Sequence, residues 1–303
     1  MNSILAFLIL ITGVLHLNSW QGSLEAKFNP PILEQNNTVL ASDFDLKTFP
    51  LLDKTVKFNF RSKAGLVVDE KNDFIIWEKN KDKVLPIASL TKMMTAIVVM
   101  ENRDPDETIT ISKTAAEIEG SSIGFLEGEK FKLKDLIKAM VIASANDGAQ
   151  ALKDDLGKKD FDVVAEMNKK AKNMGLEHTY YKDDIGLSDK NISTAWELYQ
   201  IAKEFLKNDY LRQSAKETNA KIYAESKAEY EFWTTNRLLY SESNQFSGVK
   251  TGYTEEAGNC FVGLKYVDNK YPTIFVVLNA PDGFTRFDDP DVASQYMEWY
   301  GQY

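Results

Sequence analysis

Apolar positions follow two different spacings along this chain, and the change between them divides the sequence. Towards both ends of the compact region, apolar residues alternate or form short runs, as in strands. In between, they recur every three or four residues, as in helices. The predicted strands are 64–68, 74–77, 221–224, 229–234, 249–253, 259–266 and 273–279. The predicted helices are one starting near residue 89, then 133–143, 161–174, 194–205 and 292–300.

This order predicts an α/β (α+β) fold, in which a mostly antiparallel sheet is flanked by helices and interrupted by an all-helical lobe. We expect one domain over 61–303, with sheet parts at about 61–111 and 210–303 and the lobe at about 112–209. Residues 27–60 are rich in Asn, Pro, Asp and Thr, which indicates a linker or lead-in. With 303 residues, 44% of them hydrophobic, the chain can bury a sizeable core.

The first segment has a different character, because residues 4–17 are almost wholly apolar. We interpret 1–26 as a signal peptide or an N-terminal membrane anchor, with possible membrane attachment through residues 4–17. No Lys or Arg precedes Lys27, and the run is shorter than the ~20 residues that span a bilayer comfortably. Either interpretation indicates export, and whether the segment is cleaved stays open.

Charge and cysteine content limit the partners and cofactors that we expect. The net charge of −9 and the absence of a long basic stretch exclude nucleic acid as an expected partner. Cys260 is the only cysteine, so an internal disulfide cannot form. One Cys and two His give no convincing metal-binding pattern, and we expect neither a metal nor another cofactor.

The most informative motif is Ser89-Leu-Thr-Lys92, which precedes an apolar run from Met93 to Met100. A helix starting near Ser89 would place Lys92 one turn further on, on the same face. Burial against the apolar run would lower the lysine pKa and allow a neutral amine to take the serine proton. Since one of the two histidines, His16, lies in the apolar N-terminal segment, a serine nucleophile here most plausibly relies on lysine.

A second Ser-x-x-Lys match, Ser247 to Lys250, lies in an extended context where residues three apart face opposite sides. We therefore reject it as a nucleophile–base pair. The first match gains weight from two further motifs that follow it in order: Ser144-Ala-Asn146, after a helical run, and Lys250-Thr-Gly252, on a predicted strand.

At these residues the chain resembles the superfamily of penicillin-binding proteins and serine β-lactamases. It is most similar to the low-molecular-mass D-alanyl-D-alanine carboxypeptidases, over roughly residues 63–287. The resemblance implies a β-lactamase/transpeptidase-like fold, peptidoglycan stem peptides as substrates and β-lactams as covalent inhibitors. It also implies a bacterial protein exported to the outer face of the cytoplasmic membrane, the periplasm or the cell wall.

The resemblance also implies a role for each catalytic residue. Ser89 would attack the carbonyl of the terminal D-Ala–D-Ala peptide bond, and Lys92 would accept its proton. Ser144 would relay a proton to the leaving D-Ala amine, and Asn146 would hold Lys92 and the substrate amide. Water would then hydrolyse the acyl-enzyme on Ser89.

The implied substrate-binding residues are on the C-terminal side. Lys250 would supply a second positive charge, and Thr251 would contact the substrate carboxylate. Gly252 would let the substrate backbone approach the strand edge, and the backbone N–H of Tyr253 would complete an oxyanion hole with that of Ser89. Arg286 matches an arginine close to the carboxylate pocket.

One segment departs from the family pattern, since Asp183-Asp-Ile-Gly-Leu187 replaces Asn-Pro-x-Gly-Leu and leaves the shape of that loop in question. Three alternative functions stay open: a serine β-lactamase, a D,D-endopeptidase, and a catalytically silent penicillin-binding or wall-binding protein. Class A β-lactamases use a glutamate for deacylation, and Glu204 to Asn208 resembles their Glu-x-x-x-Asn spacing. It lies too far beyond Asn146, within an ordinary amphipathic helix.

Overall fold

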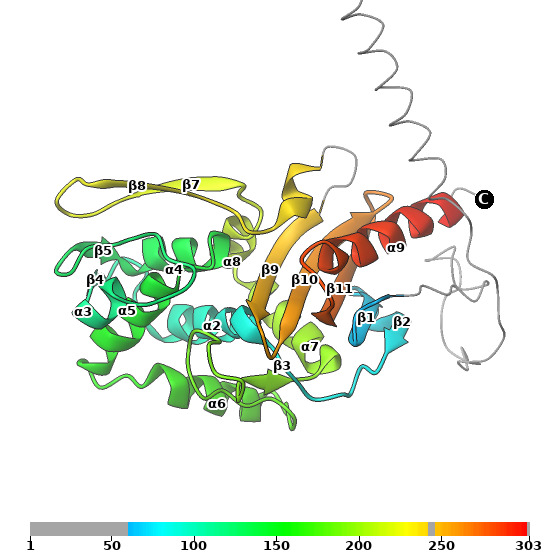
Figure 1. Ribbon diagram of the computed structural model, residues 1–303, viewed down its shortest axis with the longest axis horizontal. Coiled ribbons are helices and arrows are strands. Elements are labelled where there is room, and N and C mark those ends of the chain that lie inside the picture. The colour runs from blue at the N-terminus through cyan, green and yellow to red at the C-terminus, as the bar shows by residue number, and fades with distance from the viewer. Residues whose placement is uncertain (1–59, 242–245, 302–303) are drawn as a thin grey trace, which may run out of the picture. The chain divides into compact units, whose positions relative to one another are not determined.

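The computed structural model describes residues 60–241 and 246–301 (Figure 1). At its centre is a five-stranded sheet in which all neighbouring strands are antiparallel. The order β2-β1-β11-β10-β9 corresponds to Phe74–Lys79, Ala64–Asp69, Tyr271–Ala280, Gly258–Val267 and Phe246–Thr254. The first hairpin of the described chain therefore pairs with its last strand, which confirms the predicted sheet with parts from both ends.

Strand β11 is buried on both faces of the sheet. Ile274, Val276 and Leu278 belong to the larger hydrophobic core, whereas Phe275 and Val277 belong to a second cluster. This alternation follows from the two-residue period of a strand. Full burial of each such side chain stabilises the fold by roughly 1.5–3 kcal/mol. Because its side chains enter both clusters, β11 packs against both.

Different helices cover the two faces. Helix α9 (Thr285–Gly301) contributes Phe287, Ala293 and Met297 to the second cluster and contacts β10 and β11. Helix α7 (Ala195–Lys207) contributes to the larger core and contacts β1 and β11.

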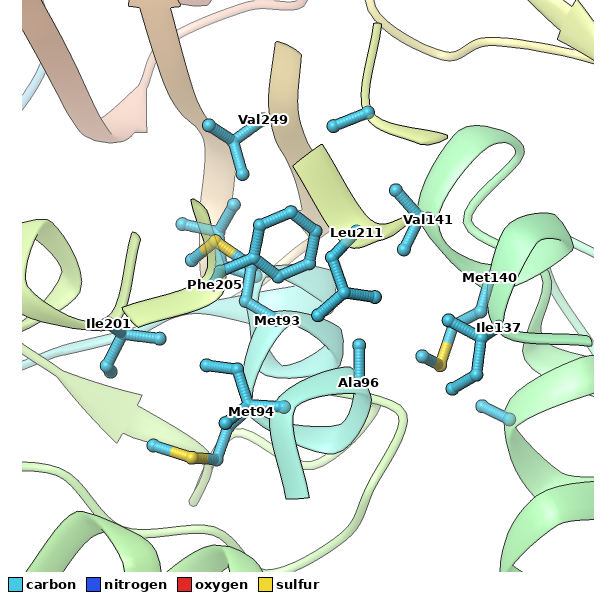
Figure 2. Close-up of a cluster of buried hydrophobic side chains, with 14 of the residues drawn as sticks. Met93, Met94, Ala96, Ile137, Met140, Val141, Ile201, Phe205, Leu211 and Val249 are labelled. Carbon is cyan, nitrogen blue, oxygen red and sulfur yellow. The ribbon is translucent and has the colours of Figure 1, made fainter. Parts of the chain in front are cut away.

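Helix α2 (Lys92–Asn102) is the centre of the larger core, with every residue from Lys92 to Val99 buried. Figure 2 shows Met93, Met94 and Ala96 surrounded by side chains from several other elements. These are Ile137, Met140 and Val141 of α4 (Leu133–Ile142), Ile201 and Phe205 of α7, Leu211 of α8 (Asp209–Ser214) and Val249 of β9. A helix that is apolar on all sides is typical of a protein interior, and this burial extends to the first residue, Lys92.

Side-chain caps fix the starts of two lobe helices close to the predicted positions. Asp162 accepts a hydrogen bond from Ala165 N at the start of α6 (Val163–Asn173), and Thr194 accepts one from Glu197 N at the start of α7. The remaining lobe helices are α3 (Lys113–Ala116) and α5 (Asn146–Gly157).

The sequence did not predict helix α5, because Asn146-Asp147-Gly148 has the composition of a turn. The sequence pattern also did not predict the shortest strands, which have too few residues to show the two-residue alternation of a strand. Two short strands, β5 and β6, lie within the lobe that was predicted to be all-helical. The short pairs are β3–β6 (Leu85–Pro86 with Ile192–Ser193) and β4–β5 (Thr108–Thr110 with Lys130–Lys132). The predicted hairpin near residue 225 is present as β7 (Asn219–Tyr223) and β8 (Glu229–Trp233).

The last helix begins at Thr285, seven residues earlier than predicted. Asp282 caps this start, since its carboxylate accepts hydrogen bonds from Phe284 N and Thr285 N. Pro290 lies inside the helix, where it removes only one backbone donor.

Within residues 60–241 and 246–301, no helix has both the length and the apolar character needed to span a bilayer. The predicted signal or anchor segment, 1–26, and the lead-in up to residue 59 lie outside the described residues.

Candidate active site

Ser89 lies in a 3₁₀ turn, Ala88–Thr91, which runs directly into α2. In a 3₁₀ helix, residues three apart lie directly above one another. Lys92, the first residue of α2, is thereby brought above Ser89, and its Nζ lies 2.8 Å from Ser89 Oγ. The α-helix thus begins three residues later than predicted, but the predicted pairing of the two side chains is present.

The Lys92 amine has three oxygen neighbours and no exposed surface. Besides Ser89 Oγ, it contacts Asn146 Oδ1 at 2.9 Å and the Ile185 carbonyl oxygen at 2.7 Å. Burial lowers the pKa of Lys92 from 10.5 to about 7, although three nearby aspartates, led by Asp184, oppose this shift. A substantial fraction of the lysine is therefore neutral at physiological pH and able to accept a proton.

Asn146 is held in one orientation. Its Nδ2 donates to the Glu119 carbonyl oxygen at 2.8 Å, which leaves Oδ1 facing Lys92. The next residue, Asp147, accepts hydrogen bonds from the backbone N–H groups of Ile123, Gly124 and Phe125. The glycine-rich loop at 120–124 is thus bound to the start of α5, where it supports Asn146.

Ser144 is buried in the connection between α4 and α5, with a positive φ of 60°. Among the described residues it makes no side-chain hydrogen bond to Ser89 or Lys92. Its proton-relay role stays a prediction.

Strand β9 brings the third motif to the same place. A Cβ atom on Gly252 would lie 3.0 Å from Ser89 N and 3.1 Å from the Ile87 carbonyl oxygen, so the strand and the 3₁₀ turn are in backbone contact. Lys250 is buried, and its Nζ donates to the Thr251 carbonyl oxygen at 3.0 Å. Burial lowers its pKa well below 10.5, and the charges of Lys92 and Arg286 act in the same direction.

The remaining predicted substrate-binding residues surround this strand. Thr251 Oγ1 lies 2.5 Å from Thr235 Oγ1, and Arg286 Nη1 donates to the Gly252 carbonyl oxygen at 3.1 Å. The Nε atom of Arg286 is buried without a hydrogen-bond partner. Tyr253 is 59% exposed beside the strand end. Ser247 and Lys250 both lie on β9, as expected for the rejected motif, and no hydrogen bond joins their side chains within the described chain.

The loop at 183–188, whose shape the sequence left open, contacts the catalytic lysine. The Asp183 carboxylate accepts hydrogen bonds from the N–H groups of Ile185, Gly186 and Ser188, and this turns the Ile185 carbonyl towards Lys92. Gly186 has a φ of 92°, and a Cβ atom there would lie 2.0 Å from the Ala88 carbonyl oxygen. Sequence reasoning missed the Ile185 carbonyl because any residue supplies that group.

Glu204, the candidate deacylating residue of the β-lactamase alternative, is part of a surface ion-pair network. Its carboxylate pairs with Lys170 at 2.8 Å and with Lys207 at 2.6 Å. Within the described residues, no hydrogen bond or ion pair joins Glu204 to Ser89 or Lys92, so its role in the β-lactamase alternative stays a prediction.

Together, these features define a class of enzyme. A serine hydroxyl activated by a buried lysine, beside a lysine-threonine-glycine strand on an antiparallel sheet covered by helices, is the arrangement of the serine acyl-transferases related to β-lactamases. Such enzymes form a covalent ester with the acyl part of the substrate.

Comparison with known proteins gives the family. The model of the D-alanyl-D-alanine carboxypeptidase family, peptidase S11, matches residues 53–282. D-alanyl-D-alanine carboxypeptidase DacF of Bacillus subtilis is 32% identical over 215 residues, which are 68% of this chain and 54% of that protein. A D-alanyl-D-alanine endopeptidase of Pseudomonas aeruginosa is 33% identical over 244 residues, 78% of this chain and 77% of that protein. The chain therefore belongs to the D-alanyl-D-alanine carboxypeptidase family of serine peptidases.

Solved structures agree with this assignment. The Streptomyces K15 DD-transpeptidase has a TM-score of 0.72 at 26% identity, covering 81% of this chain and 98% of that one. Penicillin-binding protein D2 of Listeria monocytogenes, in an ampicillin-bound form, has a TM-score of 0.68 at 28% identity, covering 80% of this chain and all of that one. The predicted β-lactamase/transpeptidase-like fold is confirmed.

Proposed function

We propose that this chain is a serine-type D-Ala-D-Ala carboxypeptidase that trims the terminal D-Ala from peptidoglycan stem peptides. The observation that carries the proposal is the position of Lys92 Nζ, fully buried and 2.8 Å from Ser89 Oγ. A lysine with a pKa of about 7 is matched to general-base work at neutral pH.

In the proposed reaction, Ser89 Oγ attacks the carbonyl carbon of the D-Ala–D-Ala bond while the neutral Lys92 amine takes the hydroxyl proton. The backbone N–H groups of Ser89 and Tyr253 stabilise the oxyanion. A proton then passes through Ser144 to the leaving nitrogen, the C–N bond breaks, and D-Ala leaves. Water attacks the resulting ester, releasing the shortened peptide and restoring the Ser89 hydroxyl.

The substrate carboxylate is proposed to bind beside β9. Arg286 provides positive charge and Thr251 provides a hydroxyl. The lowered pKa of Lys250 opposes its charged form in the free site, and a bound carboxylate would favour that form. The buried, unpartnered Nε of Arg286 supports this assignment, because a buried guanidinium nitrogen is costly unless a ligand satisfies it.

A second candidate activity is D,D-endopeptidase cleavage of peptide cross-links. It is supported by two endopeptidase relatives, from Pseudomonas aeruginosa and Escherichia coli, which are 33% and 31% identical and matched over about three quarters of their length. The chain spans 54% of the carboxypeptidase DacF and 69% of the carboxypeptidase DacB2 of Mycobacterium tuberculosis.

We further propose that the protein is exported and acts at the outer face of the membrane, in the periplasm or in the cell wall. The apolar run at 4–17 supports export, and the proposed substrate lies outside the cytoplasm. Attachment through that run is part of the same proposal.

The test is to incubate the purified protein with a defined pentapeptide muropeptide and with a cross-linked muropeptide dimer, and to weigh the products. Loss of one alanine from the pentapeptide supports carboxypeptidase activity, and conversion of the dimer to monomers supports endopeptidase activity. Ser89→Ala is the control for both. If neither substrate changes while a fluorescent penicillin still labels Ser89, the protein is a penicillin binder without peptidase activity.

A further inference from the structure

Asp184 is a buried acidic residue next to the site that the proposed reaction does not use. Its side chain has no exposed surface, and within the described chain neither carboxylate oxygen accepts a hydrogen bond from another residue. A buried carboxylate in this state is costly unless a cation compensates its charge. The compensating ion pair is with Lys153, whose Nζ lies 3.7 Å from Asp184 Oδ1 and whose side chain is 41% exposed.

The backbone around Asp184 is bound directly to the helix of the catalytic lysine. The Asp184 carbonyl oxygen accepts a 2.6 Å hydrogen bond from Thr95 Oγ1, about one turn beyond Lys92 on α2. The next carbonyl, of Ile185, accepts from Lys92 Nζ. Lys153 lies on α5, about two turns beyond Asn146, which also holds Lys92. The ion pair therefore joins the loop and the helix that both supply oxygen neighbours to the amine.

The charges around these groups come from several elements. Those acting on Lys92 are Asp183 and Asp184 of the loop, Asp147 of α5 and Lys250 of β9; those acting on Asp184 are Lys153 of α5, Asp183 and Lys92. Asp183 and Asp147 each accept several backbone N–H hydrogen bonds, whereas, among the backbone N–H groups of the described chain, the Asp184 carboxylate interacts only with its own. Burial raises the pKa of Asp184 to about 6, close to that of Lys92, and Lys153 opposes this rise.

We propose that Asp184, paired with Lys153, is a positioning residue for Lys92: the pair holds the Ile185 carbonyl against the amine, and its charge governs how readily the amine loses a proton. This inference rests on the proposed function, in which neutral Lys92 activates Ser89. Lys153 keeps Asp184 ionised, and the ionised carboxylate favours the charged form of Lys92, which opposes the effect of burial on its pKa.

Both variants of the pair should shift the pH profile of Ser89 acylation in the same direction, because each reduces the negative charge at position 184. Asp184→Asn removes a negative charge, so Lys92 deprotonates more readily. The acid limb of the pH–rate profile, where the acylation rate rises with pH, therefore moves to lower pH. Lys153→Met removes the cation that keeps Asp184 ionised, so Asp184 holds its proton to higher pH, Lys92 loses the stabilising negative charge, and the limb again moves to lower pH. We expect each shift to be about 0.5 to 1 pH unit.

The experiment uses the full chain and has two readouts. One is the rate of penicillin acylation from pH 5 to 9, and the other is the titration of Lys92 followed by the ¹³Cε signal of labelled lysine, assigned by its loss in Lys92→Arg. Asp189→Asn, an exposed charge change in the same loop, is the matched control and should shift neither readout. In the Asp184→Asn background, Lys153→Met should shift the limb less than it does in the unmodified chain.

Shifts to lower pH in both variants support the proposal. Unchanged titration of Lys92 in both, or shifts of opposite sign, would overturn it, as would a merely slower rate at an unchanged pH midpoint. If Asp184→Asn does not fold, the half-exposed Lys153→Met decides the question alone. Because the NMR readout needs no substrate, a failure of the proposed function appears as absent acylation while the Lys92 titration still reports on the pair.

Discussion

Gly252 and Ser89 are in backbone contact, since a Cβ atom on Gly252 would lie 3.0 Å from the Ser89 nitrogen. The same atom would lie 3.2 Å from the Ala88 Cβ atom. This contact fixes the distance between the 3₁₀ turn that carries Ser89 and the strand edge where we propose that the substrate binds. The position tolerates no side chain without a small displacement of one element from the other.

Gly252→Ala should therefore slow penicillin acylation by about 10- to 100-fold, because displacements of up to an ångström at a reacting centre have effects of that size. The fold should be kept, since only a few tenths of an ångström are needed. Ser247→Ala on the same strand is the control, and stopped-flow acylation is the measurement. An unchanged rate in Gly252→Ala would show that the close contact has no role in positioning Ser89.

Lys92→Met should lower the acylation rate by about three orders of magnitude or more while preserving the fold. Methionine fills a similar volume and removes a buried amine whose desolvation is costly. We therefore expect the thermal unfolding midpoint to stay the same or to rise. Circular dichroism and penicillin labelling, compared with Ser89→Ala, test both parts. A variant that keeps a tenth of the normal rate would exclude Lys92 as the base.

The pH dependence of acylation should follow the protonation of Lys92. Its pKa of about 7 predicts a rate that rises as pH increases through about 7, because only the neutral amine can accept the serine proton. The acylation rate measured against pH checks this. An acid limb near pH 10, the value of an ordinary lysine, would contradict the lowered pKa.

The same residue should affect stability with a defined sign. The folded state lowers the pKa of Lys92 from 10.5 to about 7, so between these pH values the unfolded chain binds more protons. The contribution of Lys92 to folding stability should therefore rise as pH increases from about 7 to 10.5. Comparing urea unfolding of the unmodified chain and Lys92→Met across this range isolates the effect; a difference that is constant with pH would disprove it.

Gly186→Ala should destabilise the protein and disrupt the site. The residue has a φ of 92°, and an alanine Cβ atom would lie 2.0 Å from the Ala88 carbonyl oxygen. Gly175→Ala is a matched control, since Gly175 also has a positive φ, of 74°, but a Cβ atom there meets nothing within 4 Å. The control should cost only the backbone strain of about 1–2 kcal/mol. Gly186→Ala should cost more and lose acylation, as measured by urea unfolding and labelling; equal costs for the two variants would refute the predicted clash.

The sequence predicted the parts of the site that depend on local spacing. Ser89 and Lys92 are three residues apart, and any tight helical turn brings them together, so their pairing was predictable even though the 3₁₀ turn was not. The strand carrying Lys250 was also predictable. It precedes two long apolar runs, β10 and β11, with which it forms consecutive antiparallel strands.

What the sequence could not predict depends on backbone groups and long-range packing. The Ile185 carbonyl contacts Lys92 across 93 residues of chain, and no side-chain pattern marks it. Helix α5 was missed because Asn146-Asp147-Gly148 favours a turn in isolation, whereas here the Asp147 carboxylate binds the neighbouring loop. The roles of Ser144 and Tyr253 stay predictions.

The pairing of β1 with β11 has a consequence for the timing of activity during synthesis. A ribosome that has emitted the chain only as far as residue 245 has released Ser89, Lys92 and Asn146 but not β9, and the partner strand of β1 does not yet exist. The nascent polypeptide therefore has the nucleophile but lacks the strand that faces it, and its sheet is incomplete. The proposed hydrolytic activity therefore cannot arise before β9, β10 and β11 have been translated, and a nascent chain without these strands is inactive.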